Sequence, residues 1–552
     1  MPASSTVGAP GLDLVRGQRA LSRSAWVVAL VGLLATASYA WFYYGRGLDV
    51  PDEGLLLHVA ERLARGEVPY RDVYFIYTPG LQYLLALLFR ALGPSLEVEH
   101  ALLLVLHVAL VVVVYVLAAR LSRSHVLALL AGAVAAAAGL NSYRFLLGLL
   151  SVLVVTLYAE SGRRRWLVAG GVLIGTTYLF AQEVGLYALG SALGFLGLVW
   201  LGDGSRRKDL RGLLIAAGLV GAGAAAVVGP WLLVLTTQQA LVPMLDATVR
   251  VAFLHQPRYM HVPLPPLLPI VPIDLSTNVV WGPPPYLLYV KTMLYLPLVA
   301  VVTGWLVIGA DARCGCQFAA ARERGAPARR AALPLLVFAT LALATVADRA
   351  DYYHLRQVLP VALVLLAWLL ARLKHRRGAA PVTAALVLLP FLPLLVVSLG
   401  EAASFRAEQS VPLRTVRGSV LVDETKARDL AGVLRAVRDQ TRPDAAIFVW
   451  PAETAIYFLA DRRNPTRFGQ LVSTELELLR EDDGREQRNI ITALAEAGVE
   501  WGVSAPTENV NGLPFSGYAP LLAEYLEGHF VPVQPYGYWT LQQRVVPASG
   551  PP

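Results

Sequence analysis

The sequence predicts a polytopic α-helical membrane protein with a soluble α/β domain at its C-terminal end. The first observation is composition, since 56% of the 552 residues are apolar and only 16% are charged, whereas soluble domains have about 45–50% apolar and about 25% charged residues. The second is that basic residues stand in short clusters between apolar runs, which is typical of membrane topology and accounts for the net charge of +8 without a nucleic-acid partner. The third is a sharp change of composition after Gly400.

Eleven apolar runs are predicted to cross the bilayer as helices, because about 20 residues at 1.5 Å each cover about 30 Å of hydrocarbon. They lie near residues 24–44, 99–119, 124–140, 145–160, 166–182, 184–201, 212–236, 292–310, 331–347, 356–371 and 381–399. The first run ends in the aromatic belt Trp41–Tyr44 rather than in a cleavage site, so we expect a retained span and not a signal peptide. Residues 1–23 are then an N-terminal arm, and residues 24–400 form the transmembrane domain.

A further apolar run, residues 81–93, has only 13 residues and contains Arg90, which favours an interfacial position. With this run outside the membrane, the basic clusters fall on one side: residues 16–23, 120–123, 163–165, 206–208, 313–330 and 372–377. The positive-inside rule makes that side cytoplasmic. The N-terminus is then cytoplasmic, and the outward loops are residues 45–98, 141–144, 237–291 and 348–355.

The outward loop after the first span has the most informative sequence. Asp49, Asp52 and Glu53 stand where that span leaves the membrane, and apolar residues at 55, 56, 59 and 63 recur with a period near 3.6. This period predicts an amphipathic helix that lies on the membrane surface. Its acidic pair either caps the helix, where the dipole favours negative charge, or holds a carboxylate at the depth of a lipid phosphate. Spacing alone leaves both interpretations open.

Residues 401–552 are predicted to form an extracytoplasmic α/β domain, because an odd number of spans places them on the outer side. At about 150 residues the segment is long enough to bury its own core. Three short stretches are predicted strands and two are predicted helices. The strands are residues 445–451, 499–504 and 536–544, and the helices are residues 452–460 and 521–527.

The order of elements in residues 47–93 resembles the membrane-embedded GT-C glycosyltransferases. It is most similar to the family of protein O-mannosyltransferases and the aminoarabinose transferase of lipid A, glycosyltransferase family 39. The family motif DE…G..PYRD…PPG occurs in this sequence as Asp52-Glu53, Gly66, Pro69-Tyr70-Arg71-Asp72 and Thr78-Pro79-Gly80. The tail text IFVWP…YFLADRRNPTRF is also similar to bacterial members. Two departures are Thr78 in place of the first proline and a loop 141–144 without the acidic residue that many relatives carry nearby.

The resemblance implies an enzyme that moves a sugar from a polyprenyl-phosphate donor to a hydroxyl of a glycan, lipid or protein acceptor at the outer face of the cytoplasmic membrane. A hydroxyl is a weak nucleophile, so a carboxylate must take its proton. By family analogy Asp52 is this base and Glu53 supports it, in a single displacement that inverts the sugar. The departing phosphate needs fixed cations. The candidate substrate- and phosphate-binding residues are Tyr70, Arg71, Asp72, Arg144, Gln182, Glu183, Tyr353, His354 and Arg356.

Simpler explanations exist for two of these groups. Gln182-Glu183 closes the fifth span, where the pair is either a solvated helix end or a functional polar group in a costly position. Tyr353, His354 and Arg356 lie between the ninth and tenth spans, where relatives place Tyr and Arg near the carrier lipid, although a plain polar loop would look the same. The proline-rich loop 237–291 has the length of an ordered lid.

The sequence assigns no metal site. His255 and His261 do not make a site by themselves, and Cys314 and Cys316 fall on the cytoplasmic side, where we do not expect zinc. The resemblance requires no cofactor and leaves a divalent metal open, because some relatives use one and others do not.

Two alternatives to an enzyme remain open. A transporter or lipid flippase for cell-envelope glycolipids would also have many spans, but transporters usually carry helix breaks and ionisable groups near the bilayer midplane. Here the acidic residues gather at outer loop ends, and no Gly-rich phosphate loop supports ATP-driven transport. A non-catalytic scaffold is the third interpretation, against which the pair Asp52-Glu53 argues.

Overall fold

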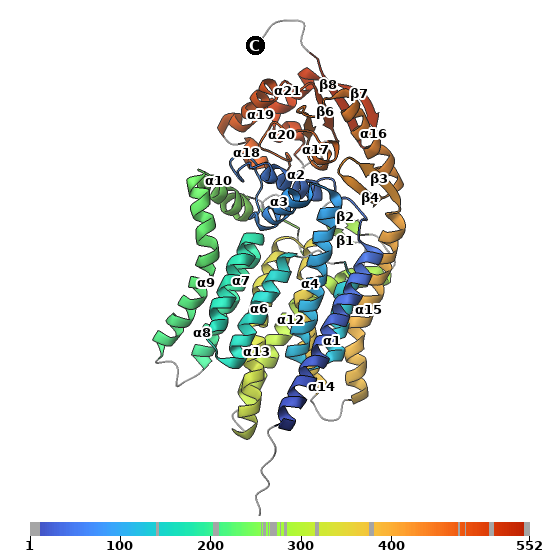
Figure 1. Ribbon diagram of the computed structural model, residues 1–552. Helices are drawn as coiled ribbons and strands as arrows, with labels where there is room; N and C mark the ends of the chain where they lie inside the picture. Colours follow the sequence, from blue (N-terminus) through green and yellow to red (C-terminus); the bar gives the residue numbers. More distant parts are fainter. Residues whose placement is uncertain are drawn as a thin grey trace, which may run out of the picture.

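The structure, a computed structural model, consists of a helix bundle with a strand-containing part above one end (Figure 1). It describes residues 11–139, 143–202, 209–255, 257, 261–262, 264, 273–275, 278–280, 284–314, 319–350, 352–374, 380–472, 475–480, 482–506 and 513–545. The strand-containing part, residues 411–545, is called the tail.

Each of the eleven predicted spans falls on a separate helix of the described chain. These helices are α1 (Gly11–Phe42), α4 (Leu96–Ser122), α5 (His125–Ala137), α6 (Tyr143–Ser161), α7 (Arg165–Phe180), α8 (Gln182–Gly202), α9 (Leu210–Thr237), α12 (Pro284–Cys314), α13 (Ala319–Asp348), α14 (Tyr352–Lys374) and α15 (Ala380–Glu408). Six of the described helices, α1, α4, α6, α8, α9 and α13, are long and apolar enough to cross a membrane by length and composition. Helices α5 and α7 and residues 295–310 of α12 are shorter apolar segments. The chain is a multi-pass membrane protein, as predicted.

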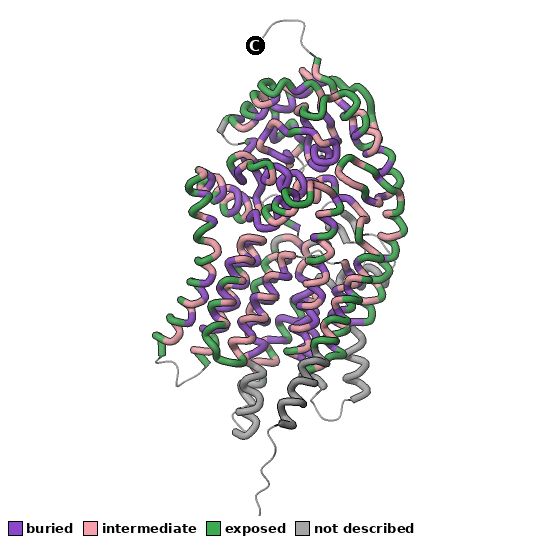
Figure 2. Tube along the Cα trace, viewed as in Figure 1, coloured by how far each residue is buried: buried purple, intermediate pink, exposed green. Residues whose placement is uncertain are grey.

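The bundle buries both small and large residues between its helices and exposes apolar residues on its outer surface. A Cβ atom on Gly171 of α7 would lie 2.2 Å from the Val220 carbonyl of α9, so glycine is what lets these two helices touch. Phe145, Phe338 and Trp368 are fully buried between helices. Buried residues line the inside of the bundle and exposed ones its outer surface (Figure 2). Exposed apolar side chains are stable there because lipid rather than water surrounds them.

Two short helices lie across the tail-facing end of the bundle, α2 (Asp52–Ala64) and α3 (Gly80–Leu92) (Figure 1). The position of α3 agrees with the prediction that residues 81–93 do not span. Helix α2 is present as predicted, and its position on the membrane surface stays a prediction. His58, Glu61 and Arg62 of its polar side are buried, because the tail covers that side instead of water.

The tail contains a four-stranded sheet of order β5-β6-β8-β7 and a separate hairpin. Strands β5 and β6 are parallel, with Phe448 opposite Gly502, and the other pairs are antiparallel. The strands are β3 (Val411–Thr415), β4 (Gly418–Val422), β5 (Phe448–Trp450), β6 (Trp501–Ser504), β7 (Phe530–Tyr536) and β8 (Trp539–Arg544). The helices are α16 (Glu424–Gln440), α17 (Ala455–Ala460), α18 (Leu476–Arg480), η3 (Asp482–Gly484), α19 (Arg485–Glu496), α20 (Phe515–Tyr518) and α21 (Pro520–His529).

The predicted strands at 445–451, 499–504 and 536–544 are confirmed as β5, β6 and β8, and the two predicted helices as α17 and α21. The hairpin β3–β4, strand β7 and helices α16 and α19 were not predicted. Helix α15 continues to Glu408, beyond the composition change at Gly400. Between α9 and α12 the chain forms α10 (Leu241–Leu245), the π-helix η2 (Asp246–His255), β1 (Ile273–Leu275) and β2 (Asn278–Val280).

The tail is joined by backbone hydrogen bonds to the loop that follows α1. The N–H of Gly47 donates to the Leu421 carbonyl at 2.7 Å, and the N–H of Ala455 donates to the Val50 carbonyl at 3.0 Å. The start of α4 is held in the same way, since the Leu96 N–H donates to the Arg417 carbonyl at 2.8 Å. The tail therefore fixes the segment that carries Asp52 and Glu53.

Candidate functional site

Asp52 and Glu53 form the first turn of α2, which packs directly against α17. Gly54 follows them, and a Cβ atom at this position would lie only 2.3 Å from the Ala455 backbone nitrogen. No other residue permits this close approach without a shift of one helix. Gly54 thus explains how the acidic pair is held against the tail.

Asp49, not the predicted pair, caps α2. The Asp49 Oδ1 atom accepts a hydrogen bond from the Asp52 N–H at 3.0 Å, while Pro51 at the N-cap position makes no side-chain cap. The Glu53 Oε2 atom accepts from the Asp49 N–H at 3.2 Å. Glu53 therefore orders the turn before the helix, and the carboxylate of Asp52 is left for another role.

The side chain of Asp52 is exposed, and several charged residues lie near enough to influence its carboxylate electrostatically. Packing of protein around the group raises the pKa of Asp52, and the neighbouring Asp49 carboxylate raises it further. The positive charges of Arg349, Arg144 and His354 act in the opposite direction. The structure thus brings Asp52 together with two of the predicted cations, Arg144 and His354, and with Arg349, which was not among the predicted residues.

Arg144, near the start of α6, is held by an acid and an aromatic ring. Its Nη1 atom donates to the Glu183 Oε1 atom of α8 at 2.9 Å. Its guanidinium lies over the Tyr77 ring, 4.6 Å from the centroid. Two members of the predicted set, Arg144 and Glu183, therefore form one partly buried ion pair that keeps Arg144 in a defined position.

Gln182 forms hydrogen bonds with the backbone of the segment between the PYRD motif and α3. Its Oε1 atom accepts from the Thr78 N–H at 3.0 Å, and its Nε2 atom donates to the Ile76 carbonyl at 2.9 Å. The Thr78 hydroxyl donates to the Tyr178 carbonyl at 2.7 Å. Gln182 is thus a buried structural residue and not a solvated helix end. Thr78 supplies two donors to this contact, its N–H and its hydroxyl.

The PYRD turn, residues 69–72, is held by hydrogen bonds within the turn and to neighbouring segments, including one from Arg71 Nη1 to the Gln238 carbonyl at 3.2 Å. Tyr70 is fully buried at a positive φ of 67°, and its hydroxyl donates to the Tyr77 carbonyl at 2.9 Å. Arg71 contacts both carboxylate oxygens of Asp72 at 2.8 and 2.9 Å. The second oxygen of Asp72 also accepts from the Val68 N–H at 2.8 Å. These contacts give Tyr70 and Asp72 a structural role in the loop.

Two residues around the start of α14 contribute to the surroundings of Asp52: Arg349 just before this helix and His354 in its first turn. The Ala350 N–H donates to the Val262 carbonyl at 3.0 Å, which brings the long loop after α9 to this position. Arg356 donates to the Ala138 carbonyl at the end of α5. Tyr353 belongs to α14, but its side chain lies outside the described residues. Of this predicted group, His354 is the residue that the structure places in the electrostatic field of Asp52.

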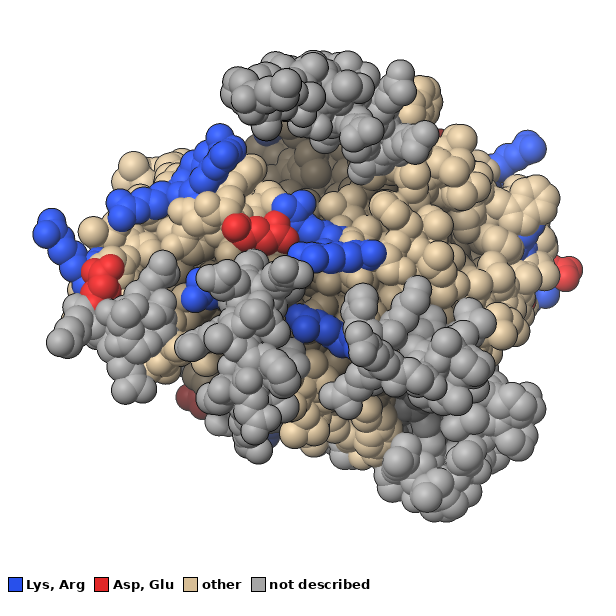
Figure 3. All heavy atoms as spheres, turned by 90° about the horizontal axis from the view of Figure 1, so that it is seen from below, with Lys and Arg blue, Asp and Glu red and all other residues tan. Residues whose placement is uncertain are grey.

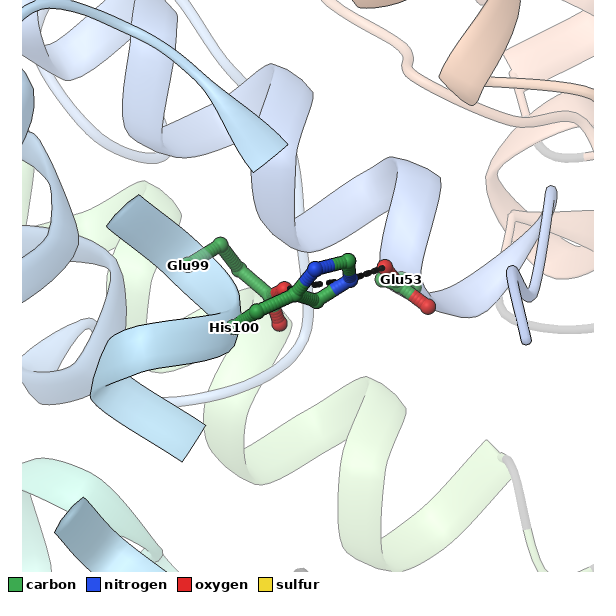
Figure 4. A group of neighbouring side chains, drawn as sticks. All are labelled: Glu53, Glu99 and His100. Carbon is green, nitrogen blue, oxygen red and sulfur yellow. Dashed lines mark ion pairs between the residues drawn. The ribbon is translucent and has the colours of Figure 1, made fainter. Parts of the chain in front are cut away.

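A second group beside Asp52 joins α2 to the start of α4. The His100 Nε2 atom lies 3.7 Å from Glu53 Oε1 and 3.6 Å from Glu99 Oε2, between the two carboxylates (Figure 4). Glu99 is fully buried, and among the described residues neither of its oxygens has a hydrogen-bond partner; the same is true of Glu53 Oε1. One ligand atom from each residue lies within 4.8 Å of the others.

The three residues Glu53, Glu99 and His100 can hold a divalent cation. Buried carboxylate oxygens without donors are costly unless a proton or a cation neutralises them. Two carboxylates and an imidazole are common ligands of zinc, and the same atom types also suit manganese or iron. This group was not predicted. The adjacent ionisable residues Glu99 and His100 at the start of an apolar helix were the available signal, because such residues are rare in spans.

Comparison of the sequence with protein-family models and with curated proteins finds no match. The fold, however, is similar to two solved structures of ArnT from Cupriavidus metallidurans, one in the apo state and one bound to undecaprenyl phosphate. Each has a TM-score of 0.53 and 16% sequence identity, over 96% of this chain and 100% of that chain. The likeness establishes the fold, which is the GT-C fold implied by the sequence motifs.

Proposed function

We propose that this chain is a membrane glycosyltransferase that moves a sugar from a polyprenyl-phosphate donor to an acceptor hydroxyl. The observation that carries the proposal is the carboxylate of Asp52, exposed at the tail-facing end of the bundle with Arg144, Arg349 and His354 around it. The similarity in fold to an ArnT structure bound to undecaprenyl phosphate supports the choice of donor class.

In the proposed reaction Asp52 is the general base. Its carboxylate takes the proton of the acceptor hydroxyl while the oxygen attacks the anomeric carbon of the sugar. The bond from that carbon to the phosphate oxygen breaks, and the lipid phosphate leaves with the electron pair. Because the attack comes from the face opposite the leaving group, the sugar configuration inverts.

The cations near Asp52 lower its pKa, and in the proposed reaction they also stabilise the departing phosphate. Negative charge grows on the lipid phosphate as it leaves, and guanidinium groups fixed nearby stabilise such charge without reorganisation. Arg144 is fixed by Glu183 and by the ring of Tyr77, Arg349 lies just before α14, and His354 lies in the first turn of α14. Glu53 supports the base indirectly, since it orders Asp49, whose carboxylate holds the backbone of Asp52.

The proposed site lies on the outer face of the membrane. Figure 3 views the end of the bundle away from the tail, where Lys and Arg side chains outnumber Asp and Glu among the described residues. The arginines 120, 123 and 163–165 lie at this end, in or next to the connections between α4 and α5 and between α6 and α7. The positive-inside rule supports a cytoplasmic position for this end, and we therefore infer that Asp52 and the tail lie outside.

The substitution Asp52→Asn tests the proposal, because it keeps the size of the side chain and removes its basicity. We expect cells that express this variant to lose the sugar modification, to the level of cells without the gene, by mass spectrometry of envelope glycans and lipid-linked sugars. The control is Glu160→Gln, which removes an acid paired with Arg120 at the other end of the bundle. Unchanged modification by a normally inserted Asp52→Asn protein would remove Asp52 from the base role.

A further inference from the structure

A cationic cavity of about 410 Å³ lies between the tail-facing ends of α1 and α15 and strand β4, apart from the residues around Asp52. Its lining residues are Arg46, Ala403, Arg406, Ala407, Ser410 and Leu421. None of these is acidic. Glu408 stands close by in sequence, but it accepts a hydrogen bond of 2.9 Å from the Ser404 hydroxyl and is not part of the lining.

The guanidinium groups of Arg46 and Arg406 both have N–H donors that form no hydrogen bond with the described residues. Arg46 uses only its Nη1 atom, which donates to the Gln409 carbonyl at 2.7 Å and to the Arg406 carbonyl at 3.4 Å. Arg406 uses its Nη1 atom to donate to the Trp41 carbonyl. Burial, and then the nearby charge of Arg406, lower the pKa of Arg46. Two positively charged guanidinium groups that line the same cavity favour the binding of an anion between them.

The cavity lies at the level where the apolar helices end. The Arg406 guanidinium lies over the Trp41 ring, 3.9 Å from its centroid, and the Trp41 side chain is 59% exposed. Exposed tryptophan is typical of the membrane–water interface. Helices α1 and α15 lie side by side below it (Figure 1), and both expose apolar side chains: Leu30, Leu33 and Leu34 on α1, and Leu392 and Val396 on α15.

We propose that this cavity binds the phosphate head group of a lipid in the outer leaflet, with its hydrocarbon chains along α1 and α15. The planar guanidinium fork matches phosphate oxygens in geometry as well as in charge. The apolar faces below supply a surface that a free anion would not need. The bound lipid would hold together α1, α15 and the tail hairpin β3–β4. This inference goes beyond the proposed function, since it holds whether or not the chain transfers a sugar.

Lipid binding to the purified full-length protein tests the inference. Native mass spectrometry in detergent would follow titration with phosphatidylglycerol and, in parallel, with diacylglycerol, which has similar chains and no phosphate. We expect phosphatidylglycerol alone to bind specifically, and Arg46→Gln or Arg406→Gln to weaken it about fivefold or more. The matched control is Arg414→Gln, because Arg414 is an exposed arginine on β3 outside this cavity.

Further measurements separate head-group recognition from loss of fold or of general charge. The variants Arg46→Lys and Arg406→Lys keep the positive charge and should retain most of the binding. Binding to the unmodified protein should weaken as salt is raised, because screening acts on exposed charges. Equal binding of diacylglycerol, unchanged binding by both Gln variants, no effect of salt, or displacement of the lipid by millimolar inorganic phosphate would each overturn the proposal.

Discussion

The guanidinium of Arg144 on α6 donates a 2.9 Å hydrogen bond to the carboxylate of Glu183 on α8. Both side chains are about one-fifth exposed, so water screens the pair only partly. The pair fixes a positive charge in the field of Asp52. A residue pair from two different spans thus positions one of the cations that the proposed reaction requires.

Substitution within this pair should lower activity in a definite order. Arg144→Gln removes a fixed cation from the departing phosphate and should lower kcat about 100-fold. Glu183→Gln keeps a hydrogen-bond acceptor for Arg144 and should cause a smaller loss. Steady-state rates with purified protein and polyprenyl-phosphate sugar would measure both, and an equal or larger loss in Glu183→Gln would contradict a positioning role for Glu183.

The pH dependence should respond to the charges around Asp52. Only the deprotonated carboxylate accepts a proton, so the rate falls on the acid side as the pH drops through the pKa of Asp52. The Asp49 carboxylate raises that pKa, and Asp49→Asn should therefore move the acid limb to lower pH. Arg349→Gln removes a charge that lowers the pKa, and it should move the limb to higher pH. Profiles of kcat/KM against pH would measure both, and shifts in the same direction would contradict the assignment.

Metal content should depend on the group of Glu53, Glu99 and His100. We expect protein dialysed against a zinc buffer to retain about one ion per chain, and Glu99→Gln or His100→Ala to lose it. Elemental analysis by mass spectrometry gives the stoichiometry. Glu97→Gln is the matched control, because Glu97 lies on the same turn and accepts the Ser419 N–H instead. Equal metal content in Glu99→Gln and Glu97→Gln would contradict a ligand role for Glu99.

The contact of α2 with the tail should be sensitive to a single methyl group. Gly54→Ala places a Cβ atom 2.3 Å from the Ala455 nitrogen, so α2 and α17 must separate. We expect a loss of about 1–3 kcal/mol in stability, together with faster proteolysis of the tail. Thermal unfolding in detergent and limited proteolysis check this result. Gly66→Ala is a poor control because its φ is +98°, whereas Gly528→Ala adds a Cβ atom in open space.

Much of the fold can be predicted from local sequence. The spans are continuous apolar runs. In lipid every backbone polar group needs a partner within the protein, and a helix supplies these partners within one segment. The strands β5, β6 and β8 were found because their apolar residues stand between turn residues. The hairpin β3–β4 and helix α16 were missed, because residues 411–440 are mixed in polarity and their order depends on packing against the chain after α1.

The candidate site was predictable only in part. The text DE followed by glycine identified Asp52 and Glu53, and the basic residues Arg144 and His354 were selected from loops that the fold brings near that carboxylate. The expectation that the PYRD turn binds substrate stays a prediction. The sequence did not show that Tyr70 is buried or that Arg71 contacts Asp72. Arg349 was passed over because nothing in its own segment distinguishes it from Arg356.

The sequence by itself determined that this chain crosses a membrane many times and carries an acidic pair at the start of a short helix, since apolar run length and helical period are local properties. The tertiary structure alone decided that the polar side of that helix is covered by the tail, and that Glu53 meets Glu99 and His100. These contacts join residues from separate helices, and their energy depends on which side chains exclude water from one another, a quantity that no single segment contains.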